Sequence, residues 1–236
     1  MWKQKILTVA ALAALSTTAM AFPSLDSVAK GVVVTQQACT MAGKNIDEKG
    51  LASVQKDLLA NTKKVSQNYL GAQLMLAEAL DLKEQTAILK AQADTLKKGS
   101  TNADKLEKVT TVGADAGKAI EAQLKKMDKL SEAQKKKVSE SLAKYGSAAL
   151  GTAQVAAKTV AASGVVVCLA SQDPVGAVKL KNKFGFVADA ALTLPSFSKD
   201  LVTTGFSYAK LLKSFDVDTS AFEKQLKQAA KIKIEK

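Results

Sequence analysis

Residues 24–173 contain no proline, and this uninterrupted stretch is the feature that most limits what the chain can fold into. Proline breaks the interior of an α-helix, so its absence removes the strongest helix terminator from a long run of residues. Alanine, leucine, lysine, glutamine and glutamate dominate the stretch, and all five have high helix propensity. The sequence therefore predicts an all-α fold.

Residues 51–98 show the clearest periodicity. The first of two seven-residue series is Leu51, Leu58, Val65, Ala72, Ala79, Thr86 and Ala93; the second, three residues on, is Val54, Asn61, Asn68, Met75, Leu82, Leu89 and Leu96. Such a seam is typical of helices that pack side by side at a shallow angle. We predict one helix of about 70 Å here, in which Asn61 and Asn68 either set the register or lie at a solvent-exposed end.

The next helix is predicted to follow directly, because Lys98-Gly99-Ser100-Thr101 is suited to end one helix and to cap another. Its apolar face consists of Leu106, Val109, Val112, Ala116, Ile120, Leu124 and Met127. Ser131 with Gln134 fits a capping box. Residues 101–170 therefore form either one very long helix or two.

The last third of the chain is less regular. Asp173-Pro174 is a start signal for a new helix, and Pro195 is predicted to separate two short helices. Ser220 with Glu223 fits another capping box, which would open a C-terminal helix rich in lysine. The predicted fold is an elongated antiparallel helical bundle with long coiled-coil-like helices and a shorter helical C-terminal part. Since we find no linker and no repeat, residues 22–236 are predicted to form a single domain.

The N-terminus predicts export. Lys3 and Lys5 precede an apolar core at residues 6–15, and Ala19-Met20-Ala21 supplies the small residues that signal peptidase requires. This core is too short for a stable membrane anchor. Residues 1–21 are therefore interpreted as a signal peptide, with Phe22 opening a mature chain that is periplasmic or secreted.

The mature chain has two cysteines, Cys39 and Cys168. In an oxidising compartment an isolated pair favours a structural disulfide, and we predict one between these two residues. Cys39 ends a segment with Leu25, Val28 and Val32 at helical spacing, although residues 32–35 could instead begin a strand.

All 34 basic residues are lysine, and the formal net charge is +12. Lysine acts as a point charge and lacks the bidentate fork that arginine offers to phosphates and guanine, so nucleic acid is not expected as a partner. The lysines either form a solvated surface or attract anionic lipid, lipopolysaccharide or an acidic protein. The densest cluster, Lys135, Lys136 and Lys137, is the candidate contact for an anionic surface.

The absence of histidine excludes Ser-His-Asp and Cys-His catalysis and histidine-based zinc sites. We predict no enzymatic activity, no cofactor and no metal. The partner is expected to be an unknown protein or an anionic component of the bacterial envelope, and the oligomeric state stays open.

Residues 146–170 contain a single charged residue, Lys158. Ala149, Ala153, Ala157 and Ala161 recur at every fourth position, which lets two helix backbones approach closely. A buried helix in a soluble bundle accounts for this segment, and so does a membrane-inserting element of a pore-forming-like protein. The two hypotheses stay open at this point.

Overall fold

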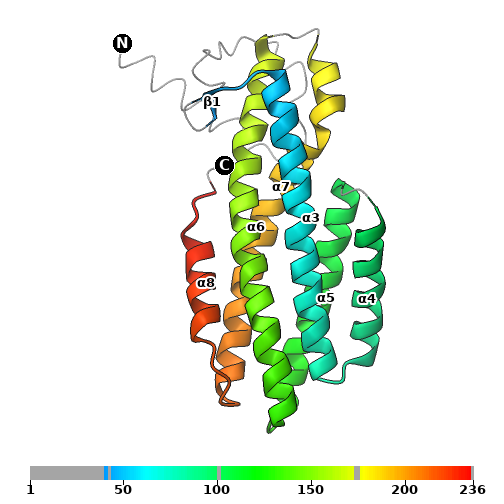
Figure 1. Ribbon diagram of the computed structural model, residues 1–236, viewed down its shortest axis with the longest axis vertical. Helices are drawn as coiled ribbons and strands as arrows, with labels where there is room; N and C mark the ends of the chain where they lie inside the picture. The colour runs from blue at the N-terminus through cyan, green and yellow to red at the C-terminus, as the bar shows by residue number, and fades with distance from the viewer. Residues whose placement is uncertain (1–39, 42–43, 100–101, 173–175, 235–236) are drawn as a thin grey trace. The chain divides into compact units, whose positions relative to one another are not determined.

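The computed structural model describes residues 40–41, 44–99, 102–172 and 176–234 (Figure 1). These residues form six α-helices and an antiparallel pairing of two two-residue strands. The elements are β1 (Thr40–Met41), β2 (Lys44–Asn45), α3 (Glu48–Ala79), α4 (Lys83–Lys98), α5 (Ala103–Lys126), α6 (Glu132–Gln172), α7 (Ala177–Lys213) and α8 (Ser220–Lys231). The predicted all-α bundle is confirmed. The predictions for residues 1–39, for Ser100-Thr101 and for Asp173-Pro174 lie outside the described residues.

The chain forms two compact units. Of the described residues, unit 1 contains those up to Leu58 together with Ala157–Leu192 and Ile234, and unit 2 contains those of Leu59–Ala156 and Thr193–Lys233. Helices α3, α6 and α7 each contribute residues to both units. The division therefore does not fall at a linker, and a single domain over residues 22–236 stays a prediction.

The buried face of α3 repeats every seven residues, but within this helix only the first of the two predicted series is right, whereas Leu89 and Leu96 of the second series are buried in α4. Leu51, Leu58, Val65, Ala72 and Ala79 are all buried, as predicted. In the second series Asn61 is exposed and Asn68 half-buried, whereas Thr62, Tyr69 and Leu76, each one residue further on, are buried. The second row of buried side chains is thus displaced by one residue, about 100° around the helix, while the first row stays in place. Polar side chains occupy part of this buried face.

The prediction of one helix over residues 51–98 is wrong, because the chain turns at Asp81. Its φ is 56°, in the left-handed region. The N–H of Leu82 donates to the carbonyl of Ala77 (2.9 Å), and that of Asp81 donates to Glu78 (3.3 Å). These two bonds form the Schellman motif that ends α-helices, usually at glycine. Aspartate tolerates this backbone conformation better than most residues, so the turn forms without the glycine signal.

Helices α4 and α5 lie side by side in unit 2 (Figure 1). As predicted, α4 ends at Lys98 with Gly99 as its C-cap. The N-cap of α5 is Asn102, whose side chain accepts from the N–H of Lys105 at 3.0 Å. The predicted α5 face is mostly confirmed, with Leu106, Val109, Ala116, Ile120 and Leu124 buried and Val112 and Met127 half-buried.

Helices α5 and α6 are separate, so residues 101–170 contain two helices. The predicted capping box at the start of α6 is confirmed. The N–H of Ser131 donates to Oε1 of Gln134 (2.9 Å), and the N–H of Gln134 donates to Oγ of Ser131 (3.3 Å). Gln134 also donates through Nε2 to the carbonyl of Ala79 (3.0 Å), which fixes the start of α6 against the end of α3 in unit 2.

Pro195 lies inside α7, so the prediction that it separates two helices is wrong. A proline removes one backbone donor from a helix, and a helix can continue with a bend when the surrounding packing holds it. The backbone of α7 departs from helical geometry at Phe184 instead, with φ −117° and ψ 20°. Phe184 is fully buried in unit 1, so tertiary packing fixes this interruption.

Helix α8 begins with contacts other than the predicted Ser220–Glu223 capping box. The N–H of Ser220 donates to Oδ1 of Asp218 (2.9 Å), and this bond lowers the pKa of the Asp218 carboxyl. Thr219 donates through Oγ1 to Oε1 of Glu223 (2.9 Å). Asp218 therefore accepts a hydrogen bond from the first residue of α8, whose N-cap is Thr219.

The centre of unit 2 is a cluster of aromatic rings from α3, α6, α7 and α8. Tyr145 makes edge-to-face contacts with Tyr69, Tyr208 and Phe222, at centroid distances of 5.7, 5.6 and 5.7 Å. Tyr69 contacts Phe197 in the same manner at 5.2 Å. Such pairs contribute about 0.5–1.5 kcal/mol beyond the burial of their area. The cluster therefore joins four helices of unit 2 through one set of rings.

Candidate functional site

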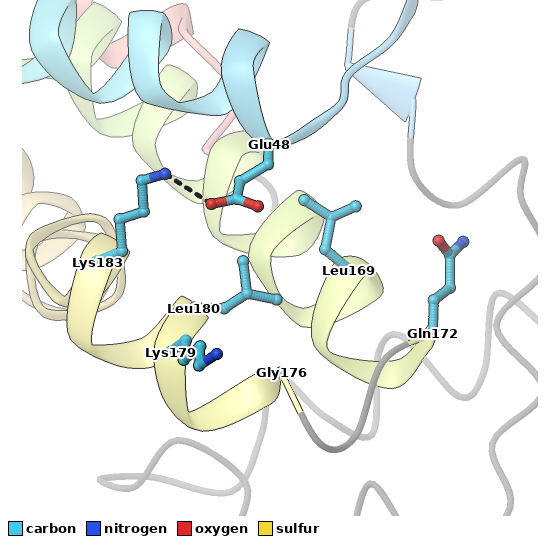
Figure 2. Close-up of a pocket in the computed structure, with 7 residues that line it drawn as sticks. All are labelled: Glu48, Leu169, Gln172, Gly176, Lys179, Leu180 and Lys183. Atoms are coloured by element: carbon cyan, nitrogen blue, oxygen red, sulfur yellow. Dashed lines mark hydrogen bonds and ion pairs between the residues drawn. The ribbon is translucent and has the colours of Figure 1, made fainter.

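A small pocket in unit 1 lies between the start of α3, the end of α6 and the start of α7 (Figure 2). It has a volume of about 280 Å³ and is open to solvent on one side. The residues that line it are Glu48, Leu169, Gln172, Gly176, Lys179, Leu180 and Lys183. Leu169 and Leu180 lie between the charged pair and Gln172, so the pocket has an apolar centre and a polar rim (Figure 2).

The charged rim of the pocket is internally paired. Lys183 Nζ lies 2.6 Å from Oε1 of Glu48, and 5.6 Å from the centroid of the neighbouring Phe184 ring. Gln55 donates through Nε2 to the carbonyl of Lys183 (3.0 Å). Both charged side chains are about half exposed, and an ion pair in that setting adds little to stability. The pair joins α3 to α7 within unit 1.

The pocket could hold one small molecule with an apolar body and a polar end. Its volume lies just below the range of about 300–1,000 Å³ typical of ligand pockets. Among the described residues no group of three or more histidine, cysteine, aspartate or glutamate side chains is placed to hold a metal ion. The pair of Glu48 with Lys183 could not be predicted from the sequence, because 135 residues separate the two and no local pattern joins them.

Cys168 lies one helical turn before the pocket residue Gln172. Its side chain is 1% exposed, and its Sγ accepts from Nε2 of Gln172 at 3.7 Å. The predicted partner, Cys39, lies outside the described residues. The Cys39–Cys168 disulfide therefore stays a prediction.

The candidate cluster Lys135, Lys136 and Lys137 opens α6, but it does not form one surface. Lys135 Nζ lies 3.1 Å from Oε1 of Glu132, and the Lys135 side chain is only 27% exposed. Lys136 and Lys137 are exposed. Consecutive residues of a helix lie about 100° apart, so the three lysines spread over about 200°. A flat anionic surface cannot contact all three.

Among the described helices, one, α6, is long and apolar enough by length and composition to cross a membrane, and half of its most apolar window is buried inside the protein. The predicted close approach holds for the first part of the alanine series. Ala149 and Ala153 are fully buried, and a Cβ on the adjacent Gly151 would lie 2.7 Å from Val65 Cγ1 of α3. Further along, Ala157 is half-buried and Ala161 exposed.

The most strongly perturbed titratable groups lie in the core of unit 2, and none of them lines the pocket of unit 1. Burial raises the pKa of Tyr69, Tyr145 and Tyr208 well above its ordinary value. Tyr208 donates to Oε1 of Gln73 or to the carbonyl of Gly117, both at 3.2 Å. The phenols therefore serve as neutral hydrogen-bonding groups of the core. The spacing of Tyr69 and Gln73 at i and i+4 was the available sequence signal for this network.

Comparison with known proteins gives no relative: no protein-family model, no curated protein and no solved structure matches the chain.

Proposed function

We propose that this chain is an exported, non-enzymatic protein that acts by binding in the bacterial envelope or outside the cell. The observation that carries the proposal is the N-terminal pattern of Lys3 and Lys5, an apolar core at residues 6–15, and Ala19-Met20-Ala21. These three parts together are typical of a secretory signal peptide. Residues 1–39 lie outside the described residues, so the support for export comes from the sequence.

The composition supports binding rather than catalysis. A chain without histidine lacks the side chain that most often transfers protons near neutral pH. The strongly shifted tyrosines are part of the core, and the pocket carboxylate of Glu48 is paired with Lys183. The expected partner is a protein or an anionic component of the envelope, and nucleic acid is not expected.

Trp2 makes the export proposal directly testable, because it is the only tryptophan of the chain. We expect the protein recovered from the periplasm or the medium to begin at Phe22 and to show tyrosine emission without tryptophan emission. Mass spectrometry of the same sample checks the N-terminus. A substitution of Ala21→Leu should block cleavage and leave tryptophan emission in the membrane fraction. An exported protein that keeps Met1 and Trp2 would contradict cleavage after Ala21, and a chain found only in the cytoplasm would contradict export.

A membrane-active role that uses residues 146–170 is the second candidate. It is favoured by the length and apolar composition of α6. Insertion would have to expose Tyr145 and move Ala149 and Ala153 out of the core of unit 2, where all three are fully buried. Release of a dye from anionic vesicles, together with a change in the circular dichroism of the protein, would support this role. Intact vesicles and an unchanged spectrum would leave binding as the function.

A further inference from the structure

Helix α8 presents three lysines on one face. Lys224, Lys227 and Lys231 are all exposed. At about 100° per residue, these positions fall within an arc of about 60°. Unlike Lys135, Lys136 and Lys137, they can therefore contact one flat surface together.

The opposite face of α8 packs against α6 and α7 in unit 2, so the lysine face points to solvent. Phe222, Leu226 and Ala229 are buried. Glycines on both neighbouring helices allow the close approach: a Cβ on Gly146 of α6 would overlap the Gln225 side chain, and a Cβ on Gly205 of α7 would lie 2.7 Å from Leu226 Cδ2. The orientation of the lysine face is therefore set by packing.

The lysine face of α8 contains no acidic residue. Glu223 is the only acid of α8, and its Oε1 lies 2.5 Å from Nζ of Lys213 in α7. Three other exposed lysines of unit 2 pair with an acid on their own helix: Lys97 with Asp94, Lys118 with Asp115 and Lys125 with Glu121. The hydrogen bond from Lys213 is the main cause of the lowered pKa of Glu223, and Lys227, one turn further along α8, lowers it as well. The charge of the α8 face is therefore only partly compensated within its own helix.

We propose that the lysine face of α8 binds the headgroups of an anionic phospholipid membrane. The proposal names the partner of the binding function proposed above and rests on export to the compartment where such a surface is reached. The remaining exposed α8 residues are Ser220, Ala221, Gln228 and Ala230. A protein interface generally needs buried aromatic or arginine anchors, which this face lacks, whereas headgroup attraction needs only clustered charge.

The test measures partitioning of the purified protein, with the same N-terminus in every variant, onto vesicles that contain phosphatidylglycerol. Each lysine near an anionic membrane contributes about a fivefold gain in affinity. The triple variant Lys224→Gln, Lys227→Gln, Lys231→Gln should therefore bind about 100-fold more weakly. Wild-type binding should disappear between about 0.1 M and 1 M salt, as the Debye length falls from about 10 Å to about 3 Å.

The matched control is Lys97→Gln, Lys118→Gln, Lys125→Gln, which removes the same charge from ion-paired positions. We expect this control, and Lys135→Gln, Lys136→Gln, Lys137→Gln, to weaken binding less than about fivefold. Glutamine keeps the helix propensity of lysine, and circular dichroism checks the fold of each variant.

Three results would overturn the membrane proposal. They are equal losses in the α8 and control variants, wild-type affinity in the α8 variant at low salt, and equal binding to vesicles of phosphatidylcholine alone. None of them bears on export, which is read separately from Trp2 and the N-terminus. A chain that stays in the cytoplasm with Trp2 retained would overturn export without altering the vesicle result.

Discussion

At the scale of single residues, the protein places all three of its tyrosines in one core. Tyr69, Tyr145 and Tyr208 are at most 3% exposed. Each phenol has a hydrogen-bond partner: Tyr69 accepts from Nε2 of Gln73 (3.2 Å), and Tyr145 donates to the carbonyl of Leu201 (3.2 Å). Because an ionised phenol would lose most of its solvation there, burial raises all three pKa values.

Raising the pH above about 10 should therefore unfold the protein, and the tyrosines should ionise as the chain unfolds and not in the folded state. An unfolded tyrosine has a pKa near 10, whereas the folded-state pKa is higher. The contribution of each tyrosine is thus fully present below about pH 10 and is lost as the pH rises, with a slope of up to about 4 kcal/mol per pH unit for the three phenols. Tyrosinate absorbance should rise together with the loss of helical circular dichroism. Ionisation with full helix content would contradict the assignment.

A substitution of Gly113→Ala tests the close contact of α5 with Tyr69. A Cβ at this position would overlap the Tyr69 ring, so we expect a loss of about 1–3 kcal/mol in the free energy of unfolding. Gly71→Ala is the control, because nothing lies within 4 Å of its Cβ position, and it should gain about 1 kcal/mol through helix propensity. Urea denaturation measures both changes. If Gly113→Ala also stabilises the protein, the ring does not pack against α5 as described.

At the scale of helices, the turns at Asp81 and Asp216 end their helices with the same backbone motif. Asp216 has a φ of 58°, and the N–H of Val217 donates to the carbonyl of Leu212 (3.2 Å) while that of Asp216 donates to Lys213 (3.2 Å). This is the same Schellman motif as at Asp81. In both turns an aspartate occupies the position at which glycine is usual, followed by an apolar residue, Leu82 or Val217.

Asp216→Gly should stabilise the end of α7. Glycine adopts the left-handed conformation without steric cost, whereas an L-residue there costs roughly 1–2 kcal/mol, less for aspartate. After the larger loss of glycine backbone entropy, we expect a net gain of up to about 0.5 kcal/mol in the free energy of unfolding. Asp216→Ala should instead destabilise the protein, because alanine keeps the strain and lacks the local hydrogen bonding of aspartate. Thermal and urea unfolding of both variants measure this difference, and a gain with alanine would rule out backbone strain.

These turns explain how much of the fold could be predicted. Helix content, the capping box at Ser131 and the end of α4 at Gly99 depend on local chemistry, and the sequence predicted them correctly. The break at Asp81 was missed because the apolar repeat continues through it and no glycine marks it. The interruption at Phe184 was misplaced to Pro195 because packing around a buried ring overrides local propensity.

At the scale of the whole molecule, the candidate site could not be predicted in the same way. The pocket of unit 1 depends on Glu48 and Lys183, which meet only after α6 and α7 have folded back on α3 within that unit. The lysines of α8 were visible as a basic helix, but their common face and the pairing of Glu223 with Lys213 required the structure. The sequence shows where lysines cluster, but only the helix geometry shows that the α8 lysines share one face and that Lys135, Lys136 and Lys137 do not.

The predicted Cys39–Cys168 disulfide would join the segment that precedes α3 to the end of α6, and so close a loop of roughly 130 residues. In the chain-entropy model such a loop contributes on the order of 4–5 kcal/mol to the free energy of unfolding. The protein isolated from the periplasm or the medium should therefore show no reactive thiol after denaturation without reductant, and two per chain after reduction.

The effect of reductant on the free energy of unfolding distinguishes this disulfide from a buried pair of reduced thiols. Reductant should lower the urea midpoint of the wild type and leave that of Cys39→Ser unchanged, since Cys39→Ser already lacks the bridge. Cys39→Ser avoids placing a hydroxyl in the core, where Cys168 is 1% exposed. The cysteines are unpaired if the wild type, without reductant, has the same urea midpoint as Cys39→Ser and shows two reactive thiols per chain. In that case the stability of unit 1 would come from the packing of its helices alone.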